Sequence, residues 1–277
     1  MKTASILIRA KNEERDLGAT LDRVFDQDLQ PHEVFVIDSG STDATLKVAA
    51  RYPVRIIEIA PRDWSYSRAL NLGAEQAAGE FVVCLSAHCR PITREWLSTL
   101  LSHFDDPRVA AAWGPSLRPG RQTYEPGLPS RQEPGSYTLE TRTYGLENSN
   151  SALRRCLWLE FPFDEALPAT EDKAWGREAM ARGYCLVHDP RAAVWHPRNP
   201  PGSAFRRNRA VLTGFEILFP EFSGHSATIV KRLPRRVWSK ICTHVLHPDP
   251  RRLWLDLANA PSVVGGILGK VLRRRRA

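Results

Sequence analysis

The sequence predicts an α/β protein in which helices flank a mainly parallel, Rossmann-like sheet, followed by a basic, mostly helical extension. Short apolar runs alternate with helix-length segments throughout residues 1–113. Strands joined by helix-length connections form right-handed βαβ units, which place the strands parallel in one sheet. The extension is distinguished by its charge, because residues 206–277 carry 15 Lys and Arg against 4 Asp and Glu.

The expected strands are short apolar runs, as is typical of buried parallel strands. They are Ser5–Arg9, Glu33–Ile37, Arg55–Ile59, Phe81–Leu85, Val109–Trp113, Cys185–His188 and Ala192–His196. Between Gly114 and about Gly145 the pattern gives way to Pro, Gly, Arg and Gln, so we expect a long loop there.

The expected helices are identified by apolar spacing and by end signals. Asn12 is predicted to cap a helix that carries Leu17 and Leu21 on one face. Further helices are expected over Arg68–Ala78, ending at Gly79, over Trp96–Phe104, and over Glu171–Arg182, ending at Gly183.

Composition indicates a globular protein, with 42% hydrophobic and 25% charged residues. No run approaches the roughly 20 apolar residues of a spanning helix, and the N-terminus does not resemble a signal peptide, so we expect a cytoplasmic protein. The five cysteines are odd in number and form no CxxC pair, which argues against a disulfide framework or a zinc ribbon. Cys84, Cys156 and Cys185 are expected to be small core or subsurface residues.

Polar or small residues follow the first, second and fourth expected strands. Ala10 and Glu13 come after the first, Asp38 after the second, and Ser86 and His88 after the fourth. Ligands of open α/β sheets bind beyond the carboxyl ends of the strands. An isolated Asp-Ser-Gly turn is usually structural, but clusters at successive strand ends favour a binding site. No G-x-G-x-x-G follows the first strand, which disfavours a dinucleotide-dependent dehydrogenase.

Five segments resemble family-2 glycosyltransferases in order and spacing. They are IRAKNEE, VIDSGSTDAT, WSYSRALNLGA, AAGEFVVCLSAHC and LPATEDKAWGREAMARGY, within residues 4–200. Within that family the chain is most similar to bacterial rhamnosyltransferase-like enzymes that build surface polysaccharides. The resemblance implies an inverting enzyme of the GT-A fold. Residues 1–205 would form the catalytic domain, with a nucleotide-binding half (1–113) and an acceptor-binding half (114–205), and residues 206–277 a basic tail.

The resemblance also implies roles for residues of the nucleotide-binding half. Ala10, Glu13 and Asp38 match positions that hold the base and ribose of a nucleotide diphosphate sugar, and a carboxylate suits this work because it accepts from N–H and O–H groups. Arg68 matches a basic position near the phosphates and is expected to pair with them; the less favoured alternative is a solvated helix-start arginine. Ser86 belongs to the same donor site.

Asp172 is the catalytic residue that we expect. Inversion by direct displacement needs a general base beside the acceptor hydroxyl, and a carboxylate at a helix N-terminus is held by backbone N–H groups. Glu171, Trp175 and Asn150 are expected to support it or to line the acceptor site. Trp175 would pack beneath the site or, alternatively, stack on a sugar. In the alternative interpretation, Glu171 and Asp172 have no catalytic role and are acidic residues of the kind common in the first turn of a helix.

The chain departs from the family at the metal motif, because His88 stands where a metal-binding aspartate is expected. His88 could bind a metal, contact the diphosphate directly, or be a plain loop histidine. The expected cofactor is Mn²⁺ or Mg²⁺, and manganese tolerates imidazole better than magnesium does. His196 matches a position that can supply a second ligand in related enzymes. We do not expect His88 and Cys89 to be zinc ligands, because no partner pair has suitable spacing.

The expected function is non-processive transfer of a sugar, from dTDP-rhamnose or a UDP-hexose, to a glycan or lipid-linked glycan. The alternative is a catalytically idle protein that binds nucleotide sugars or glycans. Residues 235–245 have helical apolar spacing, and four arginines follow at 273–276, which favours contact with the anionic inner face of the cell membrane. In the alternative, the apolar residues pack on the catalytic domain and the arginines are solvated. A nucleic-acid partner is not expected, because no RNA-binding motif accompanies these charges.

Overall fold

The computed structural model describes residues 2–120, 122–136 and 146–197, together with residues 210, 211, 213, 214, 217 and 218. The chain divides into two compact units, residues 1–166 with 171–197 and residues 167–170 with 198–277. All the elements below belong to the first unit. Nearly all of the predicted basic tail lies outside the described residues, as do both segments expected to contact a membrane. No helix in the described part of the chain is long and apolar enough to cross a bilayer.

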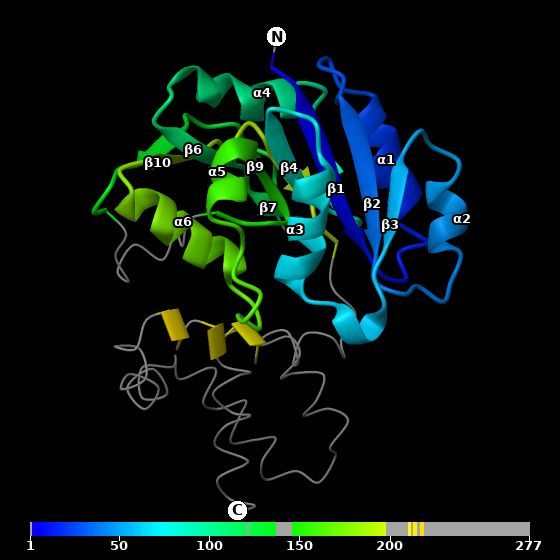
Figure 1. Cartoon of the computed structure of the whole chain (residues 1–277). Coiled ribbons are helices and arrows are strands. Elements are labelled where there is room, and N and C mark those ends of the chain that lie inside the picture. Colours follow the sequence, from blue (N-terminus) through cyan, green and yellow to red (C-terminus); the bar gives the residue numbers. More distant parts are fainter. Residues whose placement is uncertain are drawn as a thin grey trace, which may run out of the picture. The chain divides into compact units, whose positions relative to one another are not determined.

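The first unit is an α/β structure, as predicted, in which helices alternate with strands along the chain (Figure 1). Its strands are β1 (Ala4–Ala10), β2 (Glu33–Asp38), β3 (Arg55–Glu58), β4 (Phe81–Ser86), β5 (Arg90–Pro91), β6 (Val109–Trp113), β7 (Ser116–Leu117), β8 (Ser130–Gln132), β9 (Asn150–Arg154), β10 (Cys185–His188) and β11 (Val194–Trp195). Its α-helices are α1 (Leu17–Phe25), α2 (Thr45–Ala49), α3 (Tyr66–Gln76), α4 (Trp96–Ser102), α5 (Arg155–Glu160) and α6 (Glu171–Ala181), and short 3₁₀ turns span Pro61–Asp63 and His103–Asp105.

The large sheet has the order β3-β2-β1-β4-β9-β6-β10-β8. Strands β3, β2, β1 and β4 are parallel to one another, as are β6 and β10, whereas β9 runs antiparallel to β4 and β6. Strand β9 was not predicted, because the segment NSALR contains only two apolar residues and does not form an apolar run. A second, small sheet has the order β5-β11-β7.

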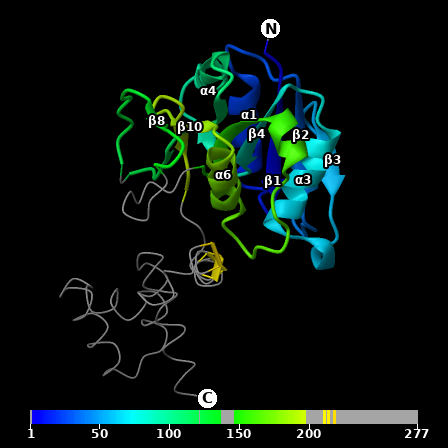
Figure 2. The same ribbon diagram turned by 60° about the vertical axis from the view of Figure 1, so that its left-hand side comes forward.

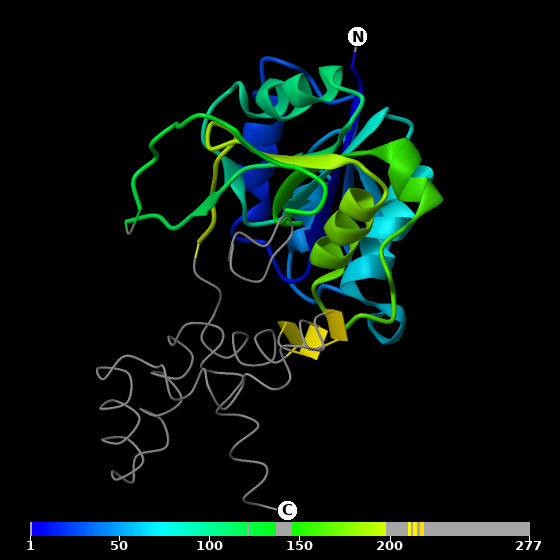
Figure 3. The same cartoon turned by 90° about the vertical axis from the view of Figure 1, so that its left-hand side faces the viewer.

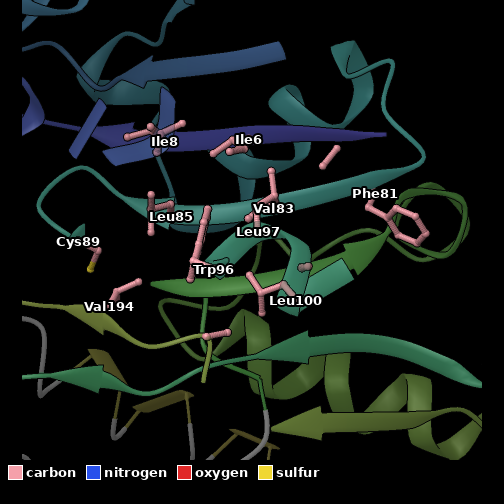
Figure 4. Close-up of a cluster of buried hydrophobic side chains, with 14 of the residues drawn as sticks. Ile6, Ile8, Phe81, Val83, Leu85, Cys89, Trp96, Leu97, Leu100 and Val194 are labelled. Atoms are coloured by element: carbon pink, nitrogen blue, oxygen red, sulfur yellow. The ribbon is translucent and has the colours of Figure 1, made fainter. Parts of the chain in front are cut away.

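Both faces of the large sheet are covered by helices. One buried cluster joins β1 and β4 to α1 and α4, with Ile8, Val83, Trp96 and Leu100 among its members (Figure 4). The other cluster lies on the opposite face and includes apolar residues of α3, α5 and α6. Figures 2 and 3 show the same division, with α3 and α6 on one side of the sheet and α1 on the other. The alternating strand residues supply both cores, as a sheet buried on two faces requires.

Several local predictions are wrong. Asn12 does not cap α1; it adopts the left-handed region at φ 55°, and the helix begins at Leu17 after Asp16. Helix α3 ends at Gln76, before Gly79, which instead allows close packing, since a Cβ there would lie 2.6 Å from the backbone nitrogen of Ser5. By contrast, Gly183 ends α6 at φ 90° as expected.

Two longer segments also differ from the prediction. The stretch expected to be a loop after Gly114 contains β7 and β8, and β8 pairs antiparallel with β10. The strand expected over Ala192–His196 is limited to β11, because the preceding residues turn back to Asp189. Cys156 is exposed, whereas Cys84 and Cys185 are buried as predicted.

A buried ion-pair cluster fixes the chain between β10 and β11. The Asp189 carboxylate is fully buried and accepts from His103 Nε2 at 2.7 Å and from Arg191 Nη2 at 2.7 Å. These charge-assisted hydrogen bonds hold the pKa of Asp189 well below its ordinary value, against the opposing effect of burial. The cluster therefore anchors the short connection that leads into the small sheet.

Candidate functional site

The strand register brings the predicted donor-site residues to one edge of the large sheet. Ala10 pairs with Asp38 across β1 and β2, and Arg9 pairs with Ser86 across β1 and β4. Because β9 is antiparallel, its first residue, Asn150, lies beside Leu85 at this same edge. The carboxyl ends of three parallel strands and the start of β9 therefore converge there, which is where open α/β sheets bind ligands.

Two loops at this edge are tied together by side-chain bonds. The Asn12 Oδ1 accepts the Thr42 backbone N–H at 2.8 Å, and the Glu13 backbone N–H donates to Thr45 Oγ1 at 2.7 Å. Asp38 is buried and accepts the backbone N–H groups of Gly40 and Ser41, at 2.9 and 2.8 Å. The contact of Asp38 with a nucleotide stays a prediction. In the structure, Asp38 stabilises the loop after β2.

The predicted base, Asp172, is half-buried in the first turn of α6. Its Oδ2 accepts the backbone N–H of Asn148 at 3.1 Å, and its Oδ1 accepts the Lys173 backbone N–H at 2.8 Å. Both carboxylate oxygens are thus held by main-chain donors while part of the side chain stays accessible. An acid in the first turn is also favoured by the helix dipole.

Glu171 lies beside Asp172 but is buried. Its Oε1 accepts from Asn148 Nδ2 at 2.9 Å and lies 3.8 Å from Arg9 Nη1. Burial raises the pKa of Glu171 above its ordinary value, the nearby Asp172 charge raises it further, and Arg9 opposes both effects. Glu171 therefore supports the turn that presents Asp172.

Sequence reasoning missed Arg9, although a charged residue at the end of an apolar strand is a usable signal. Its side chain is largely buried and its guanidinium carbon lies 5.0 Å from the centre of the Tyr66 ring. Among the described residues, two buried polar atoms of the side chains that contact Glu171 make no hydrogen bond within the chain, namely Arg9 Nη1 and Asn148 Oδ1. Unsatisfied buried polar atoms are uncommon in native proteins, so this cluster is suited to a polar ligand or ordered water.

The remaining sequence-predicted residues separate into exposed and buried groups. Arg68 is exposed near the start of α3 and lies 3.5 Å from Glu165. Trp175 is buried against Phe161, whose carbonyl oxygen accepts its indole N–H at 2.9 Å, and its place relative to the substrates stays a prediction.

Asn150 is also buried and has a structural place. Its Oδ1 accepts the Trp96 indole N–H at 2.8 Å, and its Nδ2 donates to the Ala192 carbonyl at 2.7 Å. Both ends of the amide are used within the protein, so Asn150 joins α4 and the approach to β11 to the sheet edge. The contact of Asn150 with an acceptor sugar stays a prediction.

The small sheet brings together His88 and His196, which lie far apart in the sequence. Strand β11 pairs antiparallel with β5, with Trp195 opposite Arg90. One step further along this register, His196 faces the residues just before β5. The two imidazole rings are 4.7 Å apart between centroids, and both side chains are partly exposed.

Cys89, which was not expected to be a zinc ligand, lies with the two histidines. The ligating atoms of His88, Cys89 and His196 all lie within 4.8 Å of one another. The resemblance suggested His196 as a second ligand beside His88, but the part of Cys89 could not be foreseen, because spacing along the chain does not reveal the pairing of two-residue strands. Glu13 Oε1 lies 2.8 Å from His88 Nδ1, and its predicted contact with the base or ribose stays a prediction.

The chemistry of these donors does not fit the Mg²⁺ named among the expected cofactors. Magnesium prefers oxygen ligands in octahedral geometry, whereas this group offers two imidazoles and a thiol. Within the described ranges, no other group of three or more His, Cys, Asp or Glu side chains converges in this way.

Comparison with known proteins gives a family match and a fold match. The family model Glycosyl transferase family 2 matches residues 5–160. The O-antigen chain rhamnosyltransferase WbaN of Salmonella anatum is 28% identical over 194 residues, which are 64% of this chain and 61% of that protein. RfbN of Salmonella typhimurium, also an O-antigen chain rhamnosyltransferase, is 25% identical over 202 residues, 68% of this chain and 64% of that protein. The chain thus spans under two thirds of the length of either relative.

Solved structures share the GT-A fold. Mannosyltransferase PcManGT from Pyrobaculum calidifontis, in complex with GDP-Man and Mn²⁺, gives a TM-score of 0.65 at 17% identity and covers 98% of this chain and 87% of its own. Residues 1–349 of Staphylococcus aureus TarS, in complex with UDP-GlcNAc, give a TM-score of 0.57 at 19% identity, covering 77% of this chain and 66% of that one.

Proposed function

The chain belongs to glycosyl transferase family 2, and we propose that it moves a sugar from a nucleotide diphosphate sugar to a glycan or lipid-linked glycan with inversion. The observation that carries this proposal is the position of Asp172, whose carboxylate is oriented by two backbone N–H groups and remains partly accessible at the ligand-binding edge of the sheet. A fixed carboxylate in reach of a ligand is what general-base catalysis requires.

In the proposed reaction, the Asp172 carboxylate accepts the proton of an acceptor hydroxyl. The oxygen then forms a bond to the anomeric carbon of the donor sugar on the face opposite the diphosphate. The bond between that carbon and the diphosphate oxygen breaks, and the nucleoside diphosphate leaves with the electron pair. A single displacement of this kind inverts the anomeric centre.

The residues around Asp172 position it or meet the substrates. Glu171 and Asn148 hold the turn from which α6 begins, while Arg9 supplies a buried positive charge next to the carboxylate pair. Asp38 and its loop form the proposed wall of the nucleotide site, and exposed Arg68 is the proposed phosphate contact. Preorganised groups of this kind act without reorganisation at the moment of reaction.

We propose dTDP-rhamnose or a UDP-hexose as donor and bacterial surface polysaccharide synthesis as the setting, on the strength of the similarity to the two Salmonella rhamnosyltransferases. We further propose non-processive transfer and a cytoplasmic enzyme held at the inner membrane face. The positive charge of residues 206–277 supports the membrane contact.

The proposal is tested by nucleoside diphosphate release from a panel of nucleotide sugars, with donor affinity measured in parallel by calorimetry. Asp172→Asn should bind the donor normally while turnover falls about 10²–10⁴-fold, the usual effect of losing a general base. Asp26→Asn is the matched control, because Asp26 is an exposed carboxylate in α1's C-cap that pairs only with Arg94, at 3.3 Å, among the charged residues described.

Two results would contradict this function. Turnover of Asp172→Asn within a few-fold of wild type would assign the base elsewhere. Donor binding without turnover by the wild-type protein, both with acceptor glycans and in water, would favour the catalytically idle alternative.

A further inference from the structure

The group formed by His88, Cys89 and His196 has the composition of a transition-metal site. Cys89 follows His88 directly, and His196 follows β11, so the antiparallel pairing of β5 and β11 places the three side chains together. Figure 4 shows Cys89 beside Val194 at the end of the buried cluster. Cys89 is fully buried, whereas both imidazoles are partly exposed, so a cation would enter from the histidine side.

The hydrogen bonds of the two histidines select the tautomer that binds metals. His88 Nδ1 lies 2.8 Å from the Glu13 carboxylate, and His196 Nδ1 lies 2.8 Å from the Pro197 carbonyl oxygen. A carbonyl oxygen can only accept, as can an ionised carboxylate, so each Nδ1 carries the hydrogen and each Nε2 carries the lone pair. An acceptor behind the ring is the usual support of a metal-binding histidine.

Glu13 is itself held in place, because its backbone N–H donates to Thr45 Oγ1 at 2.7 Å. The support therefore extends from the loop after β1 to the start of α2. Such second-layer contacts fix the direction of the imidazole lone pair and raise its basicity.

We propose that His88 Nε2, Cys89 Sγ and His196 Nε2 bind a borderline or soft divalent cation, of which Zn²⁺ and Co²⁺ are examples, in preference to Mg²⁺. Imidazole and thiolate select such ions, whereas Mg²⁺ requires oxygen ligands. On binding, the Cys89 thiol releases its proton to solvent and its sulfur bonds to the cation.

Three protein ligands leave the fourth position of a tetrahedral site for an exogenous oxygen. A diphosphate oxygen of the donor suits that position, and this one assignment depends on the proposed function. The preference for the cation itself does not, because it follows from the three side chains alone.

The test is a titration of the chelator-treated full-length protein with Co²⁺, without any sugar nucleotide. Wild-type protein should show the absorption of tetrahedral cobalt together with a sulfur-to-cobalt charge-transfer band. Added Zn²⁺ should abolish both signals, and a large excess of Mg²⁺ should not. The measurement needs no turnover, so it succeeds or fails independently of sugar transfer.

Variants identify the ligands. Cys89→Ser should lose the charge-transfer band, while Cys156→Ser, which changes an exposed cysteine, should keep the wild-type spectrum. Glu13→Gln should weaken Co²⁺ binding about 10–100-fold, as expected for an outer partner of a ligand. His196→Ala changes a partly exposed side chain, and should weaken binding without unfolding the protein even if Cys89→Ser does not fold. A charge-transfer band that persists in Cys89→Ser, unchanged Co²⁺ affinity in His196→Ala, or displacement of Co²⁺ by Mg²⁺ would overturn the proposal.

Discussion

Replacing Asn150 with alanine should strongly destabilise the fold, because its side chain joins two buried groups from different segments. The change leaves the Trp96 indole N–H and the Ala192 carbonyl without their partners, which lie at 2.8 and 2.7 Å in the structure. An unsatisfied buried polar group costs about 1–3 kcal/mol, so the two together cost roughly 2–6 kcal/mol. That is a large share of a typical unfolding free energy of about 5–15 kcal/mol.

Urea unfolding measures this loss, and a double-mutant cycle with Trp96→Phe shows whether the hydrogen bond is its cause. Trp96→Phe removes the donor and leaves Asn150 Oδ1 unpaired. In the double variant neither partner remains, so its destabilisation should be smaller than the sum of the two single changes by about 1–3 kcal/mol.

A second amide–indole pair on the other face of the sheet supplies the control. Trp158 Nε1 donates to Asn71 Oδ1 at 2.9 Å. Combining Asn71→Ala with Trp96→Phe joins changes in separate clusters, and these should be additive within about 0.5 kcal/mol. Additivity in the Asn150–Trp96 cycle, or a loss below about 1 kcal/mol for Asn150→Ala, would refute the reasoning.

Three further predictions concern titration and thiol chemistry. Folding favours the protonated form of Glu171, because its pKa is raised, so its contribution to the unfolding free energy is complete below the ordinary value of 4.5 and is lost as pH rises through the folded-state pKa. Glu171→Gln should remove this decline from the pH dependence of the unfolding free energy. An unchanged profile would contradict the effect assigned to burial and Asp172. The lowered pKa of Asp189 has the opposite sign, because its contribution is present above the ordinary value of 3.8 and is lost as pH falls through the folded-state pKa. Asp189→Asn should cost about 1–3 kcal/mol in neutral urea unfolding, because it weakens the hydrogen bonds of a buried carboxylate, and an unchanged unfolding free energy would contradict the role assigned to these bonds. In a variant lacking Cys242, a disulfide reagent should label exposed Cys156 quickly and Cys84 only on unfolding, because burial raises the pKa of the Cys84 thiol to about 12. Rapid labelling of Cys84 in the folded Cys156→Ser protein would contradict this prediction.

The sequence is sufficient to predict the parallel half of the sheet, because runs such as Phe81–Leu85 are apolar without interruption and are separated by helical spacing. It does not reveal β9, because Asn150 and Ser151 are polar and the segment therefore lacks an apolar run. The strand is buried because it pairs with β4 on one side and β6 on the other. Tertiary pairing outweighs local pattern at such positions.

The candidate site follows the same division. Asp172 and Asp38 were proposed from the sequence, because the end of a strand and the start of a helix have recognisable sequence signals. Arg9 and Cys89 were not, since each gains its meaning from a neighbour distant along the chain, Glu171 for the first and His196 for the second. Contacts created by folding are not encoded in local spacing.

The anomeric configuration of the transferred sugar tests the central claim most directly, namely a single displacement assisted by Asp172. Proton NMR of the product compares the anomeric configuration of the new linkage with that of the donor. Our account predicts inversion, and it predicts that Asp172→Asn forms this product about 10²–10⁴-fold more slowly. Retention of configuration would contradict it, because retention cannot arise from one displacement on the face opposite the diphosphate.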